Sequence, residues 1–170
     1  MNAGLKALAP LWLLLLASCV ASPPPVRLGS APNASRVLGL VNEARGSARR
    51  CGGKRLAAAP PLARSALLDG IAVAHARDMA ARGRMSHAGA DGSTPGERAT
   101  RAGYRWQTIG ENVAFGQSTS EQVVAGWLKS PHHCENIMDP DFTEMGIGVA
   151  AGARDKAGPY WSQVFGRLAR

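Results

Sequence analysis

The hydrophobic pattern of the chain first predicts helices. Four apolar residues at helical spacing predict a first helix that starts near residue 35: Val37, Leu40, Val41 and Ala44. Glycines and prolines over residues 45–61 predict a loop. A second, longer helix is expected over residues 62–82, where one stripe contains Leu68, Ala72, His75 and Met79. Because His75 belongs to this packed stripe, we interpret it as a core or supporting histidine and not as a direct ligand.

Strand-like runs appear in the second half of the chain. In order, the pattern predicts a glycine-rich loop (83–93), a short helix to about residue 102, a strand (109–116), a helix (118–130), a second short helix that restarts at Ser130-Pro131, and two β-type runs (145–150 and 160–166). The two final runs are separated by a polar turn, which indicates a hairpin. Helices that come first and a hairpin that comes last favour an α+β domain built in layers.

The N-terminal residues are typical of an exported protein. Residues 1–18 combine one lysine with an almost unbroken apolar run, which predicts a signal peptide too short to span a bilayer permanently. The run ends in Leu16-Ala17-Ser18-Cys19, which resembles the lipobox of bacterial lipoproteins. We therefore expect lipidation of Cys19, with ordinary cleavage near Ala21 as the alternative. Residues 19–34 are rich in proline and serine and predict a tether, and residues 35–170 predict one folded domain.

Net charge and cysteine content indicate which partners and which disulfide to expect. The formal net charge is +8, from 20 basic and 12 acidic residues. The arginines are scattered, which favours contact with anionic lipid or cell-wall polymer over nucleic acid, or simply a solvated surface. Cys51 and Cys134 remain if Cys19 is modified or removed, and in an exported protein their pairing is the simplest expectation. Two free thiols are the alternative.

Four side chains could carry chemistry if the fold brings them together: His87, Glu111, His133 and Glu144. Their spacing matches no metal-binding motif, and the chain has no phosphate-binding loop. Serine or cysteine hydrolase chemistry is disfavoured. Ser86 is adjacent to His87 and so cannot easily reach it, no Gly-x-Ser-x-Gly turn exists, and the expected disulfide removes the Cys134 thiolate.

Seven segments together resemble the CAP superfamily (SCP domain) of cysteine-rich secretory, antigen 5 and pathogenesis-related proteins, in its bacterial single-domain branch. They are, in order, Asn42 to Arg45, His75 to Ala80, Ser86-His87, Gly110 to Ala114, Trp127 to Met138, Gly146 to Val149 and Tyr160 to Gly166. The resemblance implies a three-layer α-β-α sandwich with a cleft lined by two histidines and two acids. His87, Glu111 and His133 take three of these places, and we assign the fourth to Glu144, because Lys129 and Ser130 occupy the segment where animal and plant members carry the second glutamate.

Three functional hypotheses follow from the resemblance. The histidines and acids suit a divalent cation such as zinc, or a small ligand, bound in an exported domain at the cell envelope. The alternatives are a metal-dependent hydrolase that acts on peptide or cell-wall substrates, and a structural module in which the four side chains form a polar core. We expect a monomer that is held at the outer or another membrane through its lipid anchor, or else is periplasmic or secreted. Its expected partners are a lipid or cell-wall ligand and no nucleic acid.

Overall fold

The fold is described by a computed structural model. It covers residues 34–152 and 158–170, together with Met1. The predicted signal peptide, Cys19 and the tether up to residue 33 therefore lie outside the described residues, as does part of the predicted turn between the last two strands. The first helix begins at Ala34, one residue before the predicted start of the domain.

Helices and short strands alternate along the first part of the chain, and the long hairpin closes it. In order, the elements are α1 (Ala34–Arg45), β1 (Arg49–Cys51), β2 (Lys54–Leu56), β3 (Ala63–Arg64), α2 (Ala66–Arg82), α3 (Pro95–Arg101), β4 (Trp106–Phe115), α4 (Ser120–Lys129), α5 (Pro131–Met138), β5 (Glu144–Ala150) and β6 (Tyr160–Leu168). No helix in the part of the chain that the structure describes is both long enough and apolar enough to cross a membrane.

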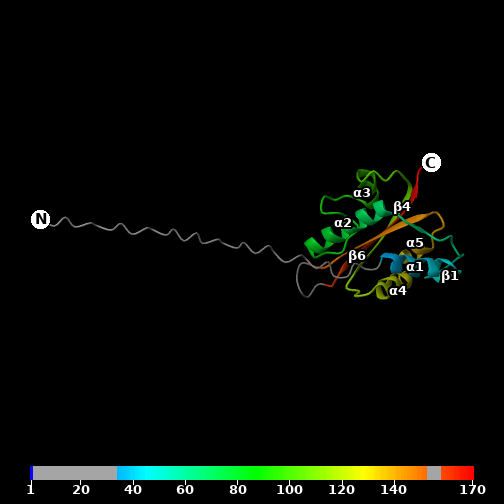
Figure 1. The fold of residues 1–170 in the computed structure, drawn as a ribbon. Helices are drawn as coiled ribbons and strands as arrows, with labels where there is room; N and C mark the ends of the chain where they lie inside the picture. The colour runs from blue at the N-terminus through cyan, green and yellow to red at the C-terminus, as the bar shows by residue number, and fades with distance from the viewer. Residues whose placement is uncertain (2–33, 153–157) are drawn as a thin grey trace.

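A four-stranded sheet in the order β3-β5-β6-β4 forms the middle layer (Figure 1). The predicted hairpin is confirmed, because β5 and β6 pair in antiparallel register from Glu144↔Gly166 to Ala150↔Tyr160. β4 pairs antiparallel to β6 and forms one edge, whereas the short β3 pairs parallel to β5 at the other edge. β4 carries Glu111, so this predicted site residue lies on an edge strand.

Helices cover both faces of the sheet, which confirms the predicted three-layer sandwich (Figure 1). Alternate residues of β6 show the division. Val164 packs with residues of α2 and α3 on one face. Trp161 and Phe165 pack with residues of α1, α4 and α5 on the other face. Period-two alternation along a central strand is what allows one strand to contribute to two cores.

Helix α2 lies unusually close to β5 because two glycines face it. A Cβ atom at Gly146 would collide with the backbone at Leu68, and one at Gly148 would collide with the backbone at Ala72. Asp69 reinforces the contact, since its Oδ1 accepts the backbone N–H of Ile147 at 2.8 Å. Helix α2 is thereby fixed over the sheet, with His75 on its buried side.

Several element boundaries differ from the sequence-based expectation. The second helix starts at Ala66 and not near residue 62, because Ser65 caps it and residues 63–64 pair with β5 instead. The predicted loop over residues 45–61 contains the small antiparallel β1–β2 sheet. Strand β4 starts at Trp106, earlier than expected. Ser130 occupies the N-cap position of α5 as predicted, but its side chain makes no capping hydrogen bond.

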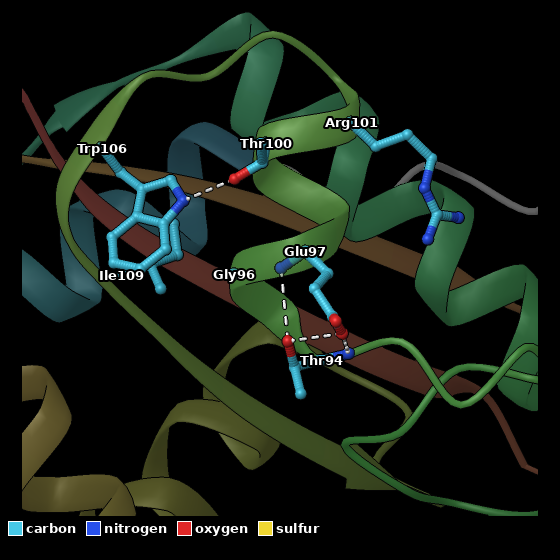
Figure 2. Close-up of a pocket in the computed structure, with 7 residues that line it drawn as sticks. All are labelled: Thr94, Gly96, Glu97, Thr100, Arg101, Trp106 and Ile109. Atoms are coloured by element: carbon cyan, nitrogen blue, oxygen red, sulfur yellow. Dashed lines mark hydrogen bonds between the residues drawn. The ribbon is translucent and has the colours of Figure 1, made fainter.

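The start of α3 follows its local sequence (Figure 2). Thr94 Oγ1 accepts the backbone N–H of Glu97 at 3.3 Å, and the Glu97 carboxylate accepts the backbone N–H of Thr94 at 2.7 Å. This capping box, with Pro95 at the first helical position, fixes where α3 begins. Arg98, one residue after the box, then projects toward the sheet, where its guanidinium reaches Glu111 at 2.8 Å.

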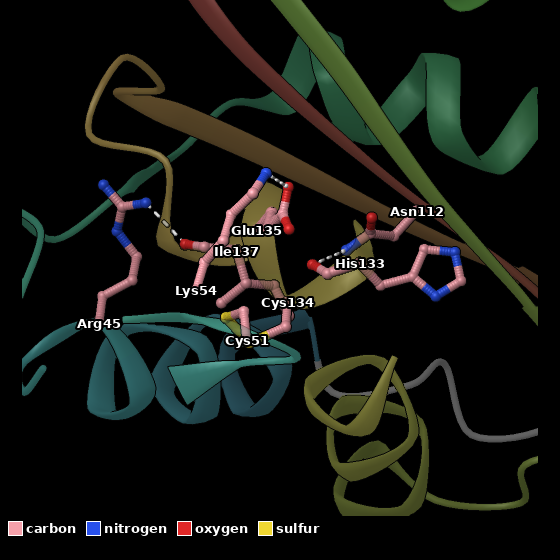
Figure 3. Close-up of a disulfide and its surroundings, with 8 residues drawn as sticks. All are labelled: Arg45, Cys51, Lys54, Asn112, His133, Cys134, Glu135 and Ile137. Carbon is pink, nitrogen blue, oxygen red and sulfur yellow. Dashed lines mark hydrogen bonds and ion pairs between the residues drawn. A yellow bond between two sulfur atoms is a disulfide. The ribbon is translucent and has the colours of Figure 1, made fainter. Parts of the chain in front are cut away.

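Two buried connections hold α5 in place (Figure 3). The predicted disulfide is confirmed: Cys51 in β1 is bonded to Cys134 in α5, with 5.5 Å between their Cα atoms. The guanidinium of Arg45, which is fully buried, donates to the carbonyl oxygens of Pro60, Ile137, Asp139 and Phe142. Both ends of the short helix α5 are therefore fastened, and so is His133 at its start.

Candidate functional site

The centre of the candidate site is a carboxylate paired with an imidazole. Glu111 lies on β4 with only 1% of its side chain exposed, and its Oε1 is 2.9 Å from Nδ1 of His87. An ionised carboxylate can only accept, so Nδ1 of His87 donates and Nε2 is the acceptor nitrogen of the neutral ring. The His87 side chain is 54% exposed. A solvent-accessible imidazole is therefore oriented by a buried acid.

Arg98 and Ser162 complete the hydrogen bonding of Glu111. Oε2 of Glu111 accepts from Nη2 of Arg98 at 2.8 Å and from Oγ of Ser162 at 3.3 Å. Arg98 also donates to the carbonyl oxygens of His87 and Ser93, at 3.0 and 2.7 Å. The guanidinium of Arg98, a residue of α3, thus connects the glycine-rich loop to β4. Both carboxylate oxygens of Glu111 accept hydrogen bonds.

His75 on α2 supports the pair formed by His87 and Glu111. Its side chain is fully buried, its Nε2 lies 2.8 Å from the carbonyl oxygen of Ser86, and the same nitrogen is 3.7 Å from Oε1 of Glu111. Because a carbonyl can only accept, Nε2 carries the proton. The interpretation of His75 as a core or supporting histidine is confirmed, since it fixes the backbone of the residue just before His87.

Burial of His75 predicts a stability that falls in mild acid. Desolvation lowers the pKa of His75 below its ordinary value of 6.5, an effect that Glu111 and Asp78 oppose and Arg98 reinforces. As the pH falls through 6.5, the unfolded chain binds a proton that the folded protein binds less readily, so stability present above that pH is lost below it. Urea midpoints should therefore be lower at about pH 5.5 than at about pH 7.5, and His75→Gln should reduce the difference. An unchanged difference in that variant would contradict this assignment.

His133 lies at the start of α5, which packs on the face of the sheet opposite to α2 and α3. Figure 3 shows its ring pointing away from the disulfide. Burial lowers the pKa of His133, and the nearby His87 and His132 lower it further. Within the described residues, no hydrogen bond or ion pair joins the ring of His133 to His87 or Glu111.

A buried amide cluster fastens α5 to β4. Asn112 Nδ2 donates to the carbonyl oxygen of His133 at 3.2 Å and to Oε1 of Gln163 at 3.1 Å. Asn136 Nδ2 donates to the carbonyl oxygen of Glu111 at 3.2 Å and to Oδ1 of Asn112 at 2.9 Å. The backbones of Glu111 and His133 are therefore held in a fixed relation, although the two residues lie on different elements.

Glu144 makes a different contact. Its Oε2 accepts the hydroxyl of Tyr104 at 2.6 Å. Burial raises the pKa of Tyr104, and the hydrogen bond to Glu144 raises it further. Among the described residues, no hydrogen bond or ion pair joins Glu144 to His87, Glu111 or His133. Its membership of the same ligand site stays a prediction, whereas its contact with Tyr104 is a feature of the fold.

The comparison with known families decides the classification. A family model described as the cysteine-rich secretory protein family (CAP) matches residues 38–165. The chain belongs to the CAP family.

Bacterial CAP relatives share part of their length with this chain. The uncharacterised protein YkwD of Bacillus subtilis is 33% identical over 105 residues, which are 62% of this chain and 39% of YkwD. An extracellular protein containing an SCP domain from Bacillus anthracis is also 33% identical, with a TM-score of 0.54, over 64% of this chain and 34% of that one. An outer surface protein of Borrelia burgdorferi, 23% identical with a TM-score of 0.58 over 64% and 78% of the two chains, shares the fold. The chain thus spans well under half the length of the first two relatives.

A divalent cation, which the CAP resemblance suggests, finds no preformed set of ligands among the described residues. Within residues 34–152 and 158–170, no group of three or more His, Cys, Asp or Glu side chains is placed to hold a metal ion. Both oxygens of Glu111 are occupied by His87, Arg98 and Ser162. The imidazoles of His87 and His133 are the predicted site groups that remain as nitrogen donors, and Glu111 orients that of His87.

Sequence reasoning did not identify Arg98, Ser162 or the amide cluster. Arg98 is one of many scattered arginines, and nothing in its neighbourhood distinguishes it. The other residues all lie inside segments that support the CAP resemblance, and this is the signal that could have drawn attention to them: Asn112, Asn136, Ser162 and Gln163.

Proposed function

We propose that this CAP domain is exported and binds a divalent cation or a small ligand at the cell envelope through His87 and His133. The observation that carries this proposal is the pairing of an accessible His87 ring with the buried Glu111 carboxylate. Ordering an exposed imidazole by a buried acid costs desolvation, which is more readily understood in a binding site than on an ordinary surface.

Export is supported by the N-terminal sequence, by the disulfide and by the relatives. Disulfides persist outside the reducing cytosol. The Bacillus anthracis relative is described as extracellular, and the Borrelia protein as an outer surface protein. We further propose that Cys19 is lipidated and that residues 19–34 tether the domain to the membrane. Mass spectrometry of the protein from its native membrane would show a diacylglyceryl adduct at Cys19, whereas an unmodified N-terminus near residue 22 would refute the anchor.

The residues divide the work of holding a cation. Nε2 of His87 and the ring of His133 would supply the nitrogen donors. Glu111 would keep the His87 ring in the tautomer that presents Nε2, and Arg98 would hold the Glu111 carboxylate in place. The cation itself would supply Lewis acidity and could lower the pKa of bound water.

Zinc titration tests this assignment directly. Calorimetry of the parent protein should show saturable uptake, and His87→Ala or His133→Ala should each weaken the affinity by about tenfold or more, because each removes one of two donors. His132→Ala is the matched control, since His132 is exposed, adjacent in sequence and assigned no role. No uptake by the parent, or equal loss in the His132 variant, would refute the proposal.

A metal-dependent hydrolase is the second candidate. The hydrogen bond between His87 and Glu111 favours it, because a carboxylate that orients a metal-binding imidazole recurs in metal sites that activate water. Hydrolysis of peptide or cell-wall substrates should then disappear in His87→Gln while the melting temperature is kept. Activity that survives this change would exclude His87 as a ligand that hydrolysis needs.

A further inference from the structure

A pocket of about 640 Å³ lies along α3, next to the candidate site but separate from its histidines. Its lining comes from α3 with its cap and from the start of β4, and consists of Thr94, Gly96, Glu97, Thr100, Arg101, Trp106 and Ile109 (Figure 2). Four of the seven lining residues carry polar side chains, and most of the remaining lining is apolar. Its volume is within the range of small-molecule sites.

Trp106 forms a fixed aromatic wall of the pocket. Its side chain is among the exposed large hydrophobic groups of the described chain, with 38% of the residue accessible. Nε1 donates to Oγ1 of Thr100 at 3.1 Å, which holds one edge of the indole. Next to the same edge, the six-membered ring lies against Gly96, where an added Cβ would come within 3.0 Å of Cζ2. The indole is thus oriented before any ligand arrives.

The polar groups along α3 offer both donors and acceptors, with Thr100 on the side of Trp106 and with Glu97 and Arg101 on the other side of the helix (Figure 2). Thr100 accepts from the indole through Oγ1 and so retains its own O–H as a donor. Glu97 receives both bonds from Thr94 on Oε2, and these bonds lower the pKa of Glu97, which keeps its carboxylate an acceptor at neutral pH. Arg101 contacts Asp91 through Nη1, and its guanidinium has further N–H groups.

From these contacts we propose that the pocket is a saccharide subsite, in which one pyranose ring stacks on Trp106 with a hydroxyl bonded to Thr100, and an adjoining ring extends across α3 to Glu97 and Arg101. A pyranose has a face of C–H bonds that suits an indole and a rim of hydroxyls that both donate and accept. A free anion would need donors only and would be repelled by Glu97. A fatty chain would cover the remaining O–H and N–H groups without bonding to them.

The subsite would select by shape as well as by hydrogen bonding. Trp106 and Ile109 form one wall, and the exposed side of α3 forms the other. Ile109 precedes Glu111 by two residues on the same face of β4, so a longer saccharide that extends from the pocket would pass toward the candidate site. The proposal does not depend on cation binding, and its test contains no metal, so the two can fail separately.

Titration with two trisaccharides tests the subsite. The purified protein is titrated with the trimer of N-acetylglucosamine and with cellotriose, followed by tryptophan fluorescence and calorimetry. Saturable binding of at least one is expected. Trp106→Ala should weaken it by about tenfold or more, and Trp106→Phe, which keeps an aromatic face, by only about threefold. Thr100→Val, which removes the hydroxyl at nearly constant volume, should also weaken binding and provides a second variant if Trp106→Ala does not fold.

The control lies on the same strand. Phe115 is 41% exposed at the far end of β4, outside the pocket. Phe115→Ala should therefore leave saccharide affinity unchanged, which separates a specific platform from general adhesion to exposed aromatics. Failure of the parent to bind either trisaccharide would overturn the proposal, as would binding to Trp106→Ala or Thr100→Val with parental affinity.

Discussion

Glu111→Ala is expected to lower the free energy of unfolding by about 3–5 kcal/mol, the range found when one partner of a buried ion pair is removed. The truncation leaves the Arg98 guanidinium, which is 11% exposed, without its carboxylate. It also removes the acceptors used by His87 and Ser162. Urea denaturation followed by circular dichroism would measure the loss.

An exposed ion pair provides the matched control for this change. Glu121 pairs with Arg36 at 2.7 Å, with about half of each side chain exposed. Glu121→Ala should lower stability far less than Glu111→Ala does, because solvent screens such exposed pairs. If the two alanine variants were equally stable, Glu111 would not be the buried electrostatic centre described above.

Glu111→Gln distinguishes the structural role from the role in binding. Glutamine keeps the shape of the side chain but replaces one carboxylate oxygen by an N–H₂ group. At the position of Oε2 this group would meet the donors of Arg98 and Ser162, and at the position of Oε1 it would force His87 into the tautomer in which Nδ1 accepts and Nε2 carries the proton. Zinc affinity should fall together with stability if Glu111 orients His87, whereas a loss of stability with unchanged zinc affinity would support the purely structural hypothesis.

The layered fold could be predicted because burial leaves a periodic trace in the sequence. Val37 and Val41 in α1, and Val123 and Trp127 in α4, are buried as their helical spacing indicates. The final hairpin was visible for the same reason, since its strands carry β-type residues on both sides of a polar turn. Short elements such as β1 and β3 were missed because two or three residues carry no detectable period.

The candidate site was predicted only as far as the family resemblance extends. His87 and Glu111 meet as expected, but the position of Glu144 depends on strand register, which one sequence does not reveal. Glu144 pairs with Gly166 of β6, whereas Glu111 pairs with Val164 from the other side of that strand. The two acids are therefore two strands apart and offset along the sheet, and Tyr104 engages Glu144 there.

Loss of the disulfide should lower the free energy of unfolding by about as much as Glu111→Ala does. This loss arises because the unfolded chain gains conformational freedom. Cys51 and Cys134 are separated by 83 residues. In the chain-entropy treatment, opening a loop of that length destabilises the fold by about 4.5 kcal/mol. Cys51→Ala with Cys134→Ala should therefore lower the urea midpoint strongly. Alanine is chosen because both cysteines are buried, so a serine would add an unpaired hydroxyl.

The two single variants, compared with the double variant, show whether the stability comes from the disulfide, because removal of either cysteine alone already breaks it. Cys51→Ala and Cys134→Ala should each lose nearly as much stability as the double variant, and the losses should be far from additive. Nearly additive losses would mean that each thiol acts through its own packing. His133 precedes Cys134 directly, so zinc affinity should fall in all three variants. The Asn112 and Asn136 hydrogen bonds still hold α5 to β4, and for that reason the affinity should be reduced and not abolished.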